Sequence, residues 1–141
     1  MVDENLIKDL KKMRKKGPSQ ASDALKMYEF VKQLAEENDE LKEELEDIDK
    51  IIIQMEVTDA NYKYWVSFGE GEVDYGEGEN DDATVTMKAS QPTWTGLSSG
   101  EIASTDAYMA GDLIIEGNLQ DAIAYGETLG LAMELGEDLL G

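Results

Sequence analysis

The sequence predicts an α+β domain in which a mostly antiparallel sheet is covered on one face by helices. Two observations lead to this prediction. Apolar residues recur at helical spacing in residues 3–49 and 118–139, whereas they alternate with polar residues from residue 50 to residue 89. Helices that are segregated from a run of hairpin strands are typical of this class. With 141 residues, the chain is long enough to bury a core of its own.

The composition excludes several classes of function. The chain has 32 acidic and 12 basic residues, 41% hydrophobic residues, no Cys and no His. Without Cys and His, a disulfide, the common zinc sites and a nucleophile activated by an imidazole are impossible. We therefore expect no enzyme, no metal and no cofactor. The sequence has no apolar stretch near the ~18 residues of a membrane span and no hydrophobic signal core, so we expect a cytoplasmic protein.

The acidic, glycine-rich stretch from Glu70 to Asp82 is expected to be a solvated hairpin. Its carboxylates would repel a phosphate group, and no helix follows directly to supply N–H donors. The spacing of the same carboxylates does not match an EF-hand calcium loop. The stretch therefore predicts neither a nucleotide site nor a calcium site.

The first 17 residues are expected to form a basic arm, distinct from the body of the domain over residues 18–141. Their apolar residues recur at helical spacing, which predicts an amphipathic helix over residues 3–16 that ends at Gly17–Pro18. Two interpretations stay open: a solvated helix docked on the body, and a helix in weak contact with a membrane or a partner. Because the body is strongly acidic, we expect no binding to nucleic acid. A membrane contact would use the basic residues of the arm: Lys8, Lys11, Lys12, Arg14, Lys15 and Lys16.

The segment from residue 20 to residue 49 has a coiled-coil pattern that is interrupted at its middle. Asn38–Asp39, followed by Glu40 and Glu43, has the residue types that cap a new helix. We therefore favour two consecutive helices packed on a sheet over a dimeric coiled coil, and a monomer or a homodimer stays open. The positions that repeat at alternating spacings of four and three are Met27, Val31, Leu34, Asn38, Leu41, Leu45, Ile48 and Ile52.

From residue 50 the hydrophobic period becomes two. This period predicts strands over residues 51–57, 62–68, 73–75 and 85–89, each with one apolar face, which we expect to pair antiparallel. A short helix is expected to begin near Pro92 and to end at Gly100. A second helical turn is expected around Tyr108.

The stretch GDLIIEG, residues 111–117, predicts the last strand. Alternation along this strand directs Leu113 and Ile115 toward the helices and Ile114 toward the opposite side. Helical segments are then expected to close the chain over residues 118–139. The positions expected to face inward are Leu119, Ala122, Ile123, Leu129, Met133 and Leu135.

The predicted interior combines flexible and small residues. Several Met residues accompany the branched aliphatic residues, and Gly126, Gly130 and Gly136 interrupt the closing helices. Met fits irregular shapes, and each internal Gly weakens a helix by about 1 kcal/mol relative to Ala. Two interpretations stay open: an ordinary core beneath a frayed C-terminus, and a ligand cavity beneath a cover that opens.

Two segments resemble the sterol carrier protein type-2 family. One is ATVTMKASQPTWTGLSSGEIASTDAYMAGDLIIEGNLQDAI, with its glycine frame at residues 100, 111 and 117, and the other is YEFVKQLAEENDELKEELEDIDKIIIQMEV followed by YKYWVSFGEGEV. The resemblance implies a five-stranded sheet and helices that enclose an apolar tunnel, where sterols, fatty acyl chains or other lipids bind non-covalently and without catalysis. Asp112 stands where many relatives have a basic residue, which favours a neutral lipid over an anionic headgroup.

The resemblance and the periodicity together predict a lipid-binding or lipid-transfer module. The alternative is a structural or regulatory module that dimerises through the helix of residues 20–49 and binds no ligand. The expected partner in the first case is an apolar lipid, which would gain about 0.8 kcal/mol for each buried methylene. The side chains expected to line its site are Met55, Tyr64, Val66, Met87, Met109, Leu113, Ile115, Ile123, Leu129 and Met133.

Overall fold

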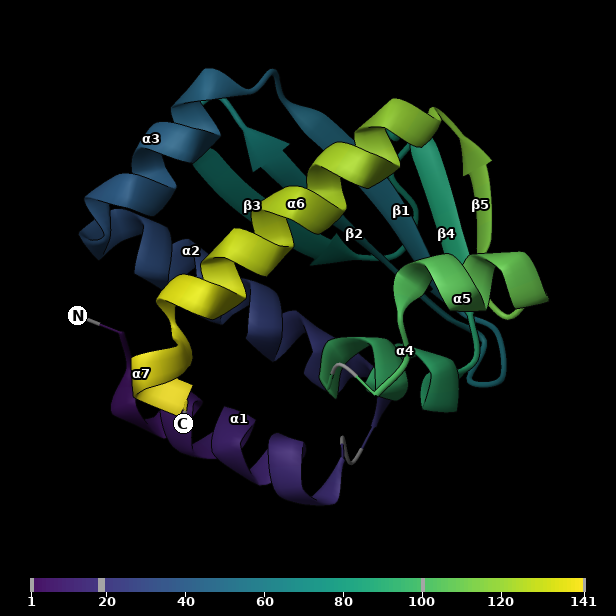
Figure 1. Cartoon of the computed structure of the whole chain (residues 1–141), viewed down its shortest axis with the longest axis horizontal. Helices are drawn as coiled ribbons and strands as arrows, with labels where there is room; N and C mark the ends of the chain where they lie inside the picture. Colours follow the sequence, from purple (N-terminus) through teal and green to yellow (C-terminus); the bar gives the residue numbers. More distant parts are fainter. Residues whose placement is uncertain (1, 18–19, 100, 141) are drawn as a thin grey trace.

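The computed structural model describes residues 2–17, 20–99 and 101–140, which form a sheet and a set of helices (Figure 1). Pro18 and Gly100, which we expected to end two helices, lie outside the described residues. The strands are β1 Ile51–Val57, β2 Tyr62–Gly69, β3 Glu72–Glu77, β4 Val85–Ala89 and β5 Ile114–Gly117. The helices are α1 Glu4–Lys16, α2 Ala24–Glu37, α3 Asp39–Asp47, α4 Gln91–Ser99, α5 Ser104–Ala110, α6 Leu119–Leu135 and α7 Glu137–Leu140, with a short 3-10 turn at Ala21–Asp23.

The five strands form one mixed sheet in the order β3-β2-β1-β4-β5. The pairs β1–β2, β2–β3 and β4–β5 are antiparallel, as the sequence predicts. The pair β1–β4 is parallel, so the sheet is mostly antiparallel as predicted, but the antiparallel pairing expected for the fourth strand is wrong. The chain makes the β2–β3 hairpin on one side of β1 and then returns across the sheet, so β4 enters on the other side of β1 in the same direction.

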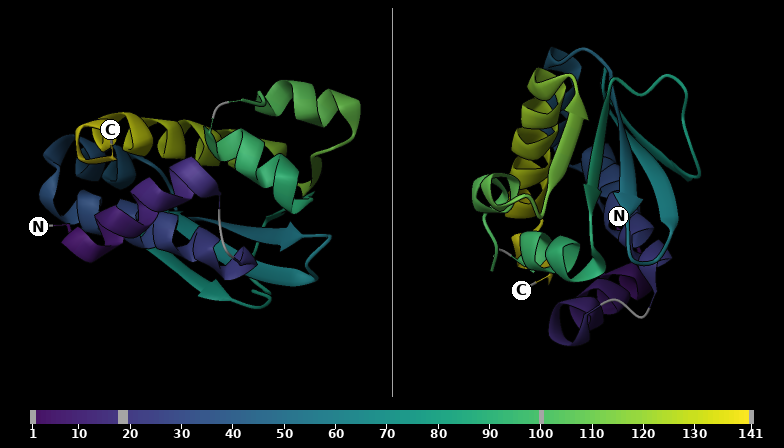
Figure 2. Two further views of the ribbon diagram at one scale, coloured as in Figure 1. Left: turned by 90° about the horizontal axis from the view of Figure 1, so that it is seen from below. Right: turned by 90° about the vertical axis from the view of Figure 1, so that its right-hand side faces the viewer.

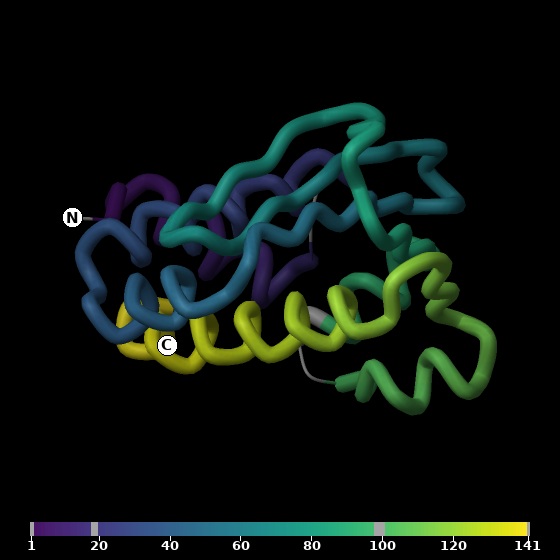
Figure 3. The backbone as a smooth tube through the Cα atoms, turned by 90° about the horizontal axis from the view of Figure 1, so that it is seen from above, coloured from purple at the N-terminus to yellow at the C-terminus, as the bar shows by residue number. Residues whose placement is uncertain are grey.

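Helices cover one face of this sheet, as predicted, and the core lies between the two layers (Figure 2). The side chains that alternate onto the inner face of β1 and β2, among them Ile53 and Phe68, are fully buried. The opposite face carries polar side chains such as Glu56 and Lys63. The view from above places α6 along the inner side of the sheet, while α5 extends away from the rest of the molecule (Figure 3).

The predicted break between two helices at Asn38 is confirmed. The carboxamide oxygen of Asn38 accepts a hydrogen bond from the backbone N–H of Leu41 at 3.1 Å, which caps α3. The seam residues Val31, Leu41 and Leu45 are fully buried within this chain. The helix pair therefore packs on its own sheet and does not continue as one coiled-coil helix.

The predicted orientation of the last strand is also confirmed. The predicted inward face of α6 is confirmed in part, because Ala122 is buried and Leu129, Met133 and Leu135 pack against the core, whereas two positions do not face inward. Leu113 is buried and Ile115 half-buried, whereas Ile114 is exposed. Leu119 and Ile123, which we expected to face inward, are each 48% exposed. The helix instead places small residues and one aromatic residue toward the sheet. Its buried positions are Ala122, Tyr125, Thr128 and Ala132.

The N-terminal helix docks on the body. Leu10 is buried and Met13 packs against the core, which leaves the basic side chains of α1 on the solvent side. The guanidinium of Arg14 donates to both carboxylate oxygens of Glu137 in α7, at 2.9 and 3.0 Å. This pair joins the start of the chain to its end, and it engages one of the six basic groups that we expected to meet a membrane.

Candidate functional site

Four of the predicted site residues form one row across the inner face of the sheet. In the strand register, Tyr64 of β2 pairs with Met55 of β1, Met55 with Met87 of β4, and Met87 with Ile115 of β5. Four neighbouring strands are separated by three spacings, which together measure about 14 Å. The two inner Met residues are at most 6% exposed, whereas Ile115 at the edge strand is half-buried. The row therefore runs from the buried middle of the molecule to an edge of the sheet.

The other predicted site residues divide into two groups. Val66 and Leu113 are buried, and Leu129 and Met133 of α6 are half-buried and pack against the core. Met109 is 81% exposed on α5, and Ile123 is exposed on α6, so the structure does not bring these two side chains to the inner layer. The expectation that Ile123 faces inward fails because the helix turns its small residues toward the sheet.

The side chains between the sheet and α6 are mostly buried, and among the described residues no tunnel of the kind implied by the family resemblance is observed. Two hollows of about 300 Å³ in the described part of the chain lie elsewhere. One lies on the opposite, polar face of the sheet, and the other lies among lysines of α1. Binding of an apolar guest in the inner layer would therefore require the helical cover to move.

The cover over this layer is weak in its middle. Gly126 and Gly130 lie inside α6, and a Cβ atom added at either position would meet no other atom within 4 Å. No close packing therefore requires Gly at these two positions, although each costs about 1 kcal/mol of helix stability relative to Ala. At Gly136 the reason is different, because a Cβ there would lie 2.7 Å from the ring of Phe30. The end of α6 is thus closely packed against α2, whereas Gly126 and Gly130 lie on the exposed side of the helix.

Three tyrosine hydroxyls meet in the same layer. They come from Tyr28 of α2, Tyr64 of β2 and Tyr125 of α6, which are 2%, 2% and 5% exposed. The oxygens of Tyr28 and Tyr125 are 2.7 Å apart and share a hydrogen bond. Burial is the main cause that raises the pKa of each phenol above its ordinary value, so all three stay protonated at neutral pH.

Sequence reasoning found only one member of this hydroxyl cluster. Tyr64 lies on an alternating strand, but Tyr28 and Tyr125 are 97 residues apart, and no local pattern connects them. The available signal was the composition, because the chain contains six Tyr and only two Phe. A buried phenol needs a hydrogen-bonding partner, so an excess of Tyr over Phe in apolar helical positions indicates interior hydroxyl pairs.

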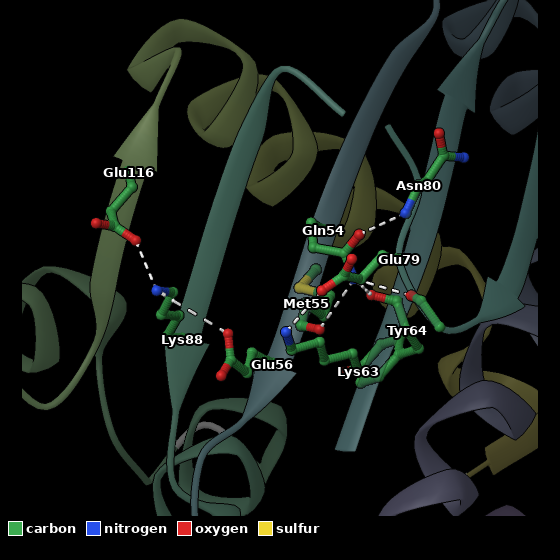
Figure 4. A network of polar contacts seen from close by, with 10 residues as sticks. Gln54, Met55, Glu56, Lys63, Tyr64, Glu79, Asn80, Lys88 and Glu116 are labelled. Carbon is green, nitrogen blue, oxygen red and sulfur yellow. Dashed lines mark hydrogen bonds and ion pairs between the residues drawn. The ribbon is translucent and has the colours of Figure 1, made fainter. Parts of the chain in front are cut away.

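The opposite face of the sheet carries a polar network around Gln54 (Figure 4). The buried amide of Gln54 donates to the backbone oxygens of Tyr64 and Gly78, both at 3.0 Å, and accepts from the N–H of Asn80 at 2.8 Å. These bonds fasten the turn after β3 onto the sheet. Gln54 thus has its hydrogen-bonding groups occupied in a structural role, which explains a buried amide on this face.

Lysines on the same face are paired with carboxylates. Lys88 lies 2.8 Å from Glu116 and 4.0 Å from Glu56, and Lys63 lies 2.7 Å from Glu79. The partner carboxylates raise the pKa of both lysines. Within residues 2–17, 20–99 and 101–140, no group of three or more acidic side chains is arranged to hold a metal ion.

Large exposed apolar side chains are concentrated in one continuous segment. Those among the described residues all lie between residues 108 and 123, on α5, β5 and the first half of α6, next to the edge where the cross-strand row ends. In the described part of the chain, no helix has both the length and the apolar character to cross a membrane. The exposed side chains are Tyr108, Met109, Ile114, Leu119 and Ile123.

Residues 31–130 match the model of the SCP-2 sterol transfer family. No curated protein matches the chain. The chain is similar to the apo form of sterol carrier protein 2 from Yarrowia lipolytica, with a TM-score of 0.57 and 17% identity over 74% of this chain and 88% of that one. It is also similar to palmitated SCP2L2 from Aedes aegypti, with a TM-score of 0.52 and 16% identity over 73% and 90% of the two chains.

A third similar structure belongs to a much longer protein. The inverting sec-alkylsulfatase Pisa1 from Pseudomonas sp. gives a TM-score of 0.58 and 17% identity over 75% of this chain, but over only 16% of the sulfatase chain. The chain therefore spans a small part of the length of that protein. At these identities, all three similarities show a shared fold.

Proposed function

The chain belongs to the SCP-2 sterol transfer family, and on this premise we propose that it binds an apolar lipid non-covalently between its sheet and α6 and releases it without catalysis. Membership in this family supports lipid binding or transfer in general. The observation that supports the location is the cross-strand row from Tyr64 through Met55 and Met87 to Ile115. The row is apolar from Met55 to Ile115, and it ends beside exposed apolar side chains.

The energetics of such a site favour affinity without strict selectivity. Each buried methylene contributes about 0.8 kcal/mol, so a long acyl chain would contribute on the order of 10 kcal/mol before the costs of ordering and association. The flexible side chains of Met55 and Met87 adapt to ligands of different shapes. The palmitated Aedes aegypti neighbour is consistent with an acyl chain as one such ligand. Val66, Leu113, Leu129 and Met133 would complete the inner wall, and Met109 and Ile123 would lie at its mouth.

Entry of the ligand would require α6 to move, because the side chains of the inner layer are buried in this structure. The helix is weakened at Gly126 and Gly130, and the residues it places on the sheet are mostly small. Its last turn packs against Phe30, so the first half of the helix is the part we expect to lift. This movement would expose the row at its β5 end, next to Ile114.

Delivery at a membrane would use the basic face of α1. Lys8, Lys11, Lys12 and Lys15 line one hollow on the outside of this helix, while its apolar face packs on the body. Such an arrangement favours weak, salt-sensitive attraction to anionic lipid headgroups over insertion. We expect this contact in the cytoplasm, which stays a prediction. Binding to vesicles that contain anionic lipid should fall when Lys8 and Lys12 are replaced by Glu.

The alternative of a ligand-free dimerisation module has less support. It requires the seam of the helix pair to be free for a second copy, and Val31, Leu41 and Leu45 of that seam are buried against the chain's own sheet. A monomer that carries lipid is therefore the function we favour. The sequence offers neither His nor Cys for acid-base or nucleophilic chemistry, which favours a carrier over an enzyme.

Native mass spectrometry of the protein purified from cells, together with displacement of a fluorescent fatty probe, tests the proposal. We expect co-purifying lipid and probe binding that Met87→Trp reduces, because the indole would fill the middle of the row. Thr86→Trp is the matched control, because residue 86 alternates onto the opposite face. Circular dichroism would establish that both variants fold. An empty protein that ignores the probe, or equal effects of the two variants, would contradict the proposed function.

A further inference from the structure

The three buried hydroxyls of Tyr28, Tyr64 and Tyr125 lie at one end of the cross-strand row. Tyr64 is itself the first member of the row, and the other two reach it from α2 and α6. The rings are held in place by one another. The ring of Tyr28 lies 6.0 Å from that of Tyr64, and the ring of Tyr125 is stacked on Phe68 at 5.6 Å. The row therefore has a polar end inside the molecule and an apolar end at the edge strand.

These hydroxyls have hydrogen-bonding capacity beyond what they use on one another. Each phenol carries one hydrogen to donate and lone pairs to accept. The Tyr28 and Tyr125 oxygens share one bond of 2.7 Å, and the Tyr64 hydroxyl is near enough to Tyr28 for each to shift the pKa of the other. The Tyr28–Tyr125 pair has two phenolic hydrogens and uses one of them in its shared bond. One donor and one acceptor position are therefore left for a group that enters this layer.

The charge around the hydroxyls restricts what that group can be. Among the described residues, the buried polar and charged side chains are Asp23, Gln54, Ser67 and Thr128, and no Lys or Arg is buried. A carboxylate or phosphate placed at the hydroxyls would be desolvated without a cation to compensate it, which is costly. A neutral hydroxyl or carbonyl oxygen would use the spare hydrogen bond without this cost.

We propose that Tyr28, Tyr64 and Tyr125 form the polar end of the lipid site and receive a neutral lipid head that carries one hydroxyl or carbonyl oxygen. This inference rests on the proposed function and specifies its ligand class. The apolar part of the lipid lies along Met55 and Met87 toward the β5 edge. Selection against free fatty acids follows from the missing cation, and acceptance of a neutral head follows from the spare donor and acceptor.

Four probes with 16 carbon atoms differ only in their head group, so their affinities compare the head groups at about equal chain length. They are 1-hexadecanol, hexadecan-2-one, hexadecanoate and hexadecane. Each would displace a fluorescent aliphatic probe from the intact protein at pH 7.5. We expect the alcohol or the ketone to bind about tenfold more tightly than hexadecanoate. The tighter binder of the alcohol and the ketone identifies which neutral head group the site prefers.

The variants Tyr28→Phe and Tyr125→Phe remove one hydroxyl each and keep the ring. Each should reduce the preference for the alcohol over hexadecane by about fivefold, the size of one hydrogen bond. Tyr62→Phe is the matched control, because the Tyr62 hydroxyl donates instead to Glu77 in an exposed hydrogen bond. Thermal unfolding would establish that the three variants are folded.

The outcomes separate this proposal from the one on which it rests. Binding of all four probes with equal strength, or a preference that the two inner variants leave unchanged, would overturn the polar end and leave the lipid carrier standing. Tighter binding of hexadecanoate than of the alcohol would also overturn it. If no probe binds at all, the proposed function and the polar end both fail.

Discussion

The two halves of the sheet, taken along the strand order, are covered in different ways. In one half, β2 and β3 lie beneath α2 and α3 with β1 beside them, and inner residues such as Ile53, Phe68 and Leu41 are fully buried. In the other half, the four-residue strand β5 forms the edge, and the large exposed apolar side chains lie on it and on its two neighbouring helices. We call the first half, β1–β3 with α2 and α3, the frame. We call the second half, β5 with α5 and the first half of α6, the edge. The difference indicates that the frame supplies stability and the edge supplies access to the inner layer.

Two Met residues provide the sharpest test of this comparison. Met55 is fully buried in the frame, and Met109 is 81% exposed at the edge. Met55→Ala leaves a cavity in a closed core and should lower the free energy of unfolding by about 2–5 kcal/mol. Met109→Ala should change it by less than about 0.5 kcal/mol. Urea unfolding of both variants measures the two effects, and similar losses would remove the distinction between frame and edge.

The next largest effect is expected from the two open glycines of α6. Because added Cβ atoms meet nothing at Gly126 or Gly130, Ala at both positions should stabilise the protein by up to about 2 kcal/mol in total. The same change should slow the uptake of a lipid probe, since a stiffer cover opens less often. Gly136→Ala is the contrasting variant, and it should destabilise the protein because its Cβ would collide with Phe30. Stabilisation without slower uptake would show that α6 is not the moving cover.

Two helix-capping residues allow the same comparison between frame and edge, with smaller expected effects on stability. Asn38 caps α3 in the frame, and Asn118 caps α6 beside the edge by accepting from the N–H of Asp121 at 3.2 Å. Replacing either residue by Ala should cost about 1 kcal/mol. We expect Asn118→Ala to speed hydrogen exchange in α6 alone, whereas Asn38→Ala should lower protection throughout the frame. The same exchange pattern in both variants would contradict independent opening of α6.

The frame could be predicted from the sequence more fully than the edge. Alternation identified the inner faces of β1 and β2, and the residue types at Asn38–Asp39 identified the helix break. Alternation does not specify a strand's partner, so the parallel pairing of β1 with β4 was missed. For α6, apolar character ranked Leu119 and Ile123 as inward, but the helix approaches the sheet through small residues. That choice depends on packing between distant segments.

Only part of the candidate site could be predicted from the sequence. Four predicted residues lie in one cross-strand row because each belongs to the inner face of a strand that alternation recognises. The hydroxyl pair of Tyr28 and Tyr125 could not be predicted, because it joins two helices that meet only after folding. Met109 follows a helical spacing, but α5 lies away from the core and leaves its side chain in solvent.

The smallest expected effects concern two exposed ion pairs, Arg14–Glu137 and Lys63–Glu79. In each pair the cation lowers the pKa of the carboxylate, so the pair contributes stability above the usual pKa of Glu and loses it as the pH falls through the lowered value. Both pairs are exposed, and salt should weaken them.

The pair of Arg14 joins α1 to α7 at the end of α6, whereas the pair of Lys63 lies within one hairpin region. Glu137→Gln should therefore speed release of a lipid probe slightly and remove part of its dependence on pH and salt, and Glu79→Gln should leave release unchanged. Equal release rates in both variants would show that the Arg14–Glu137 pair does not restrain α6.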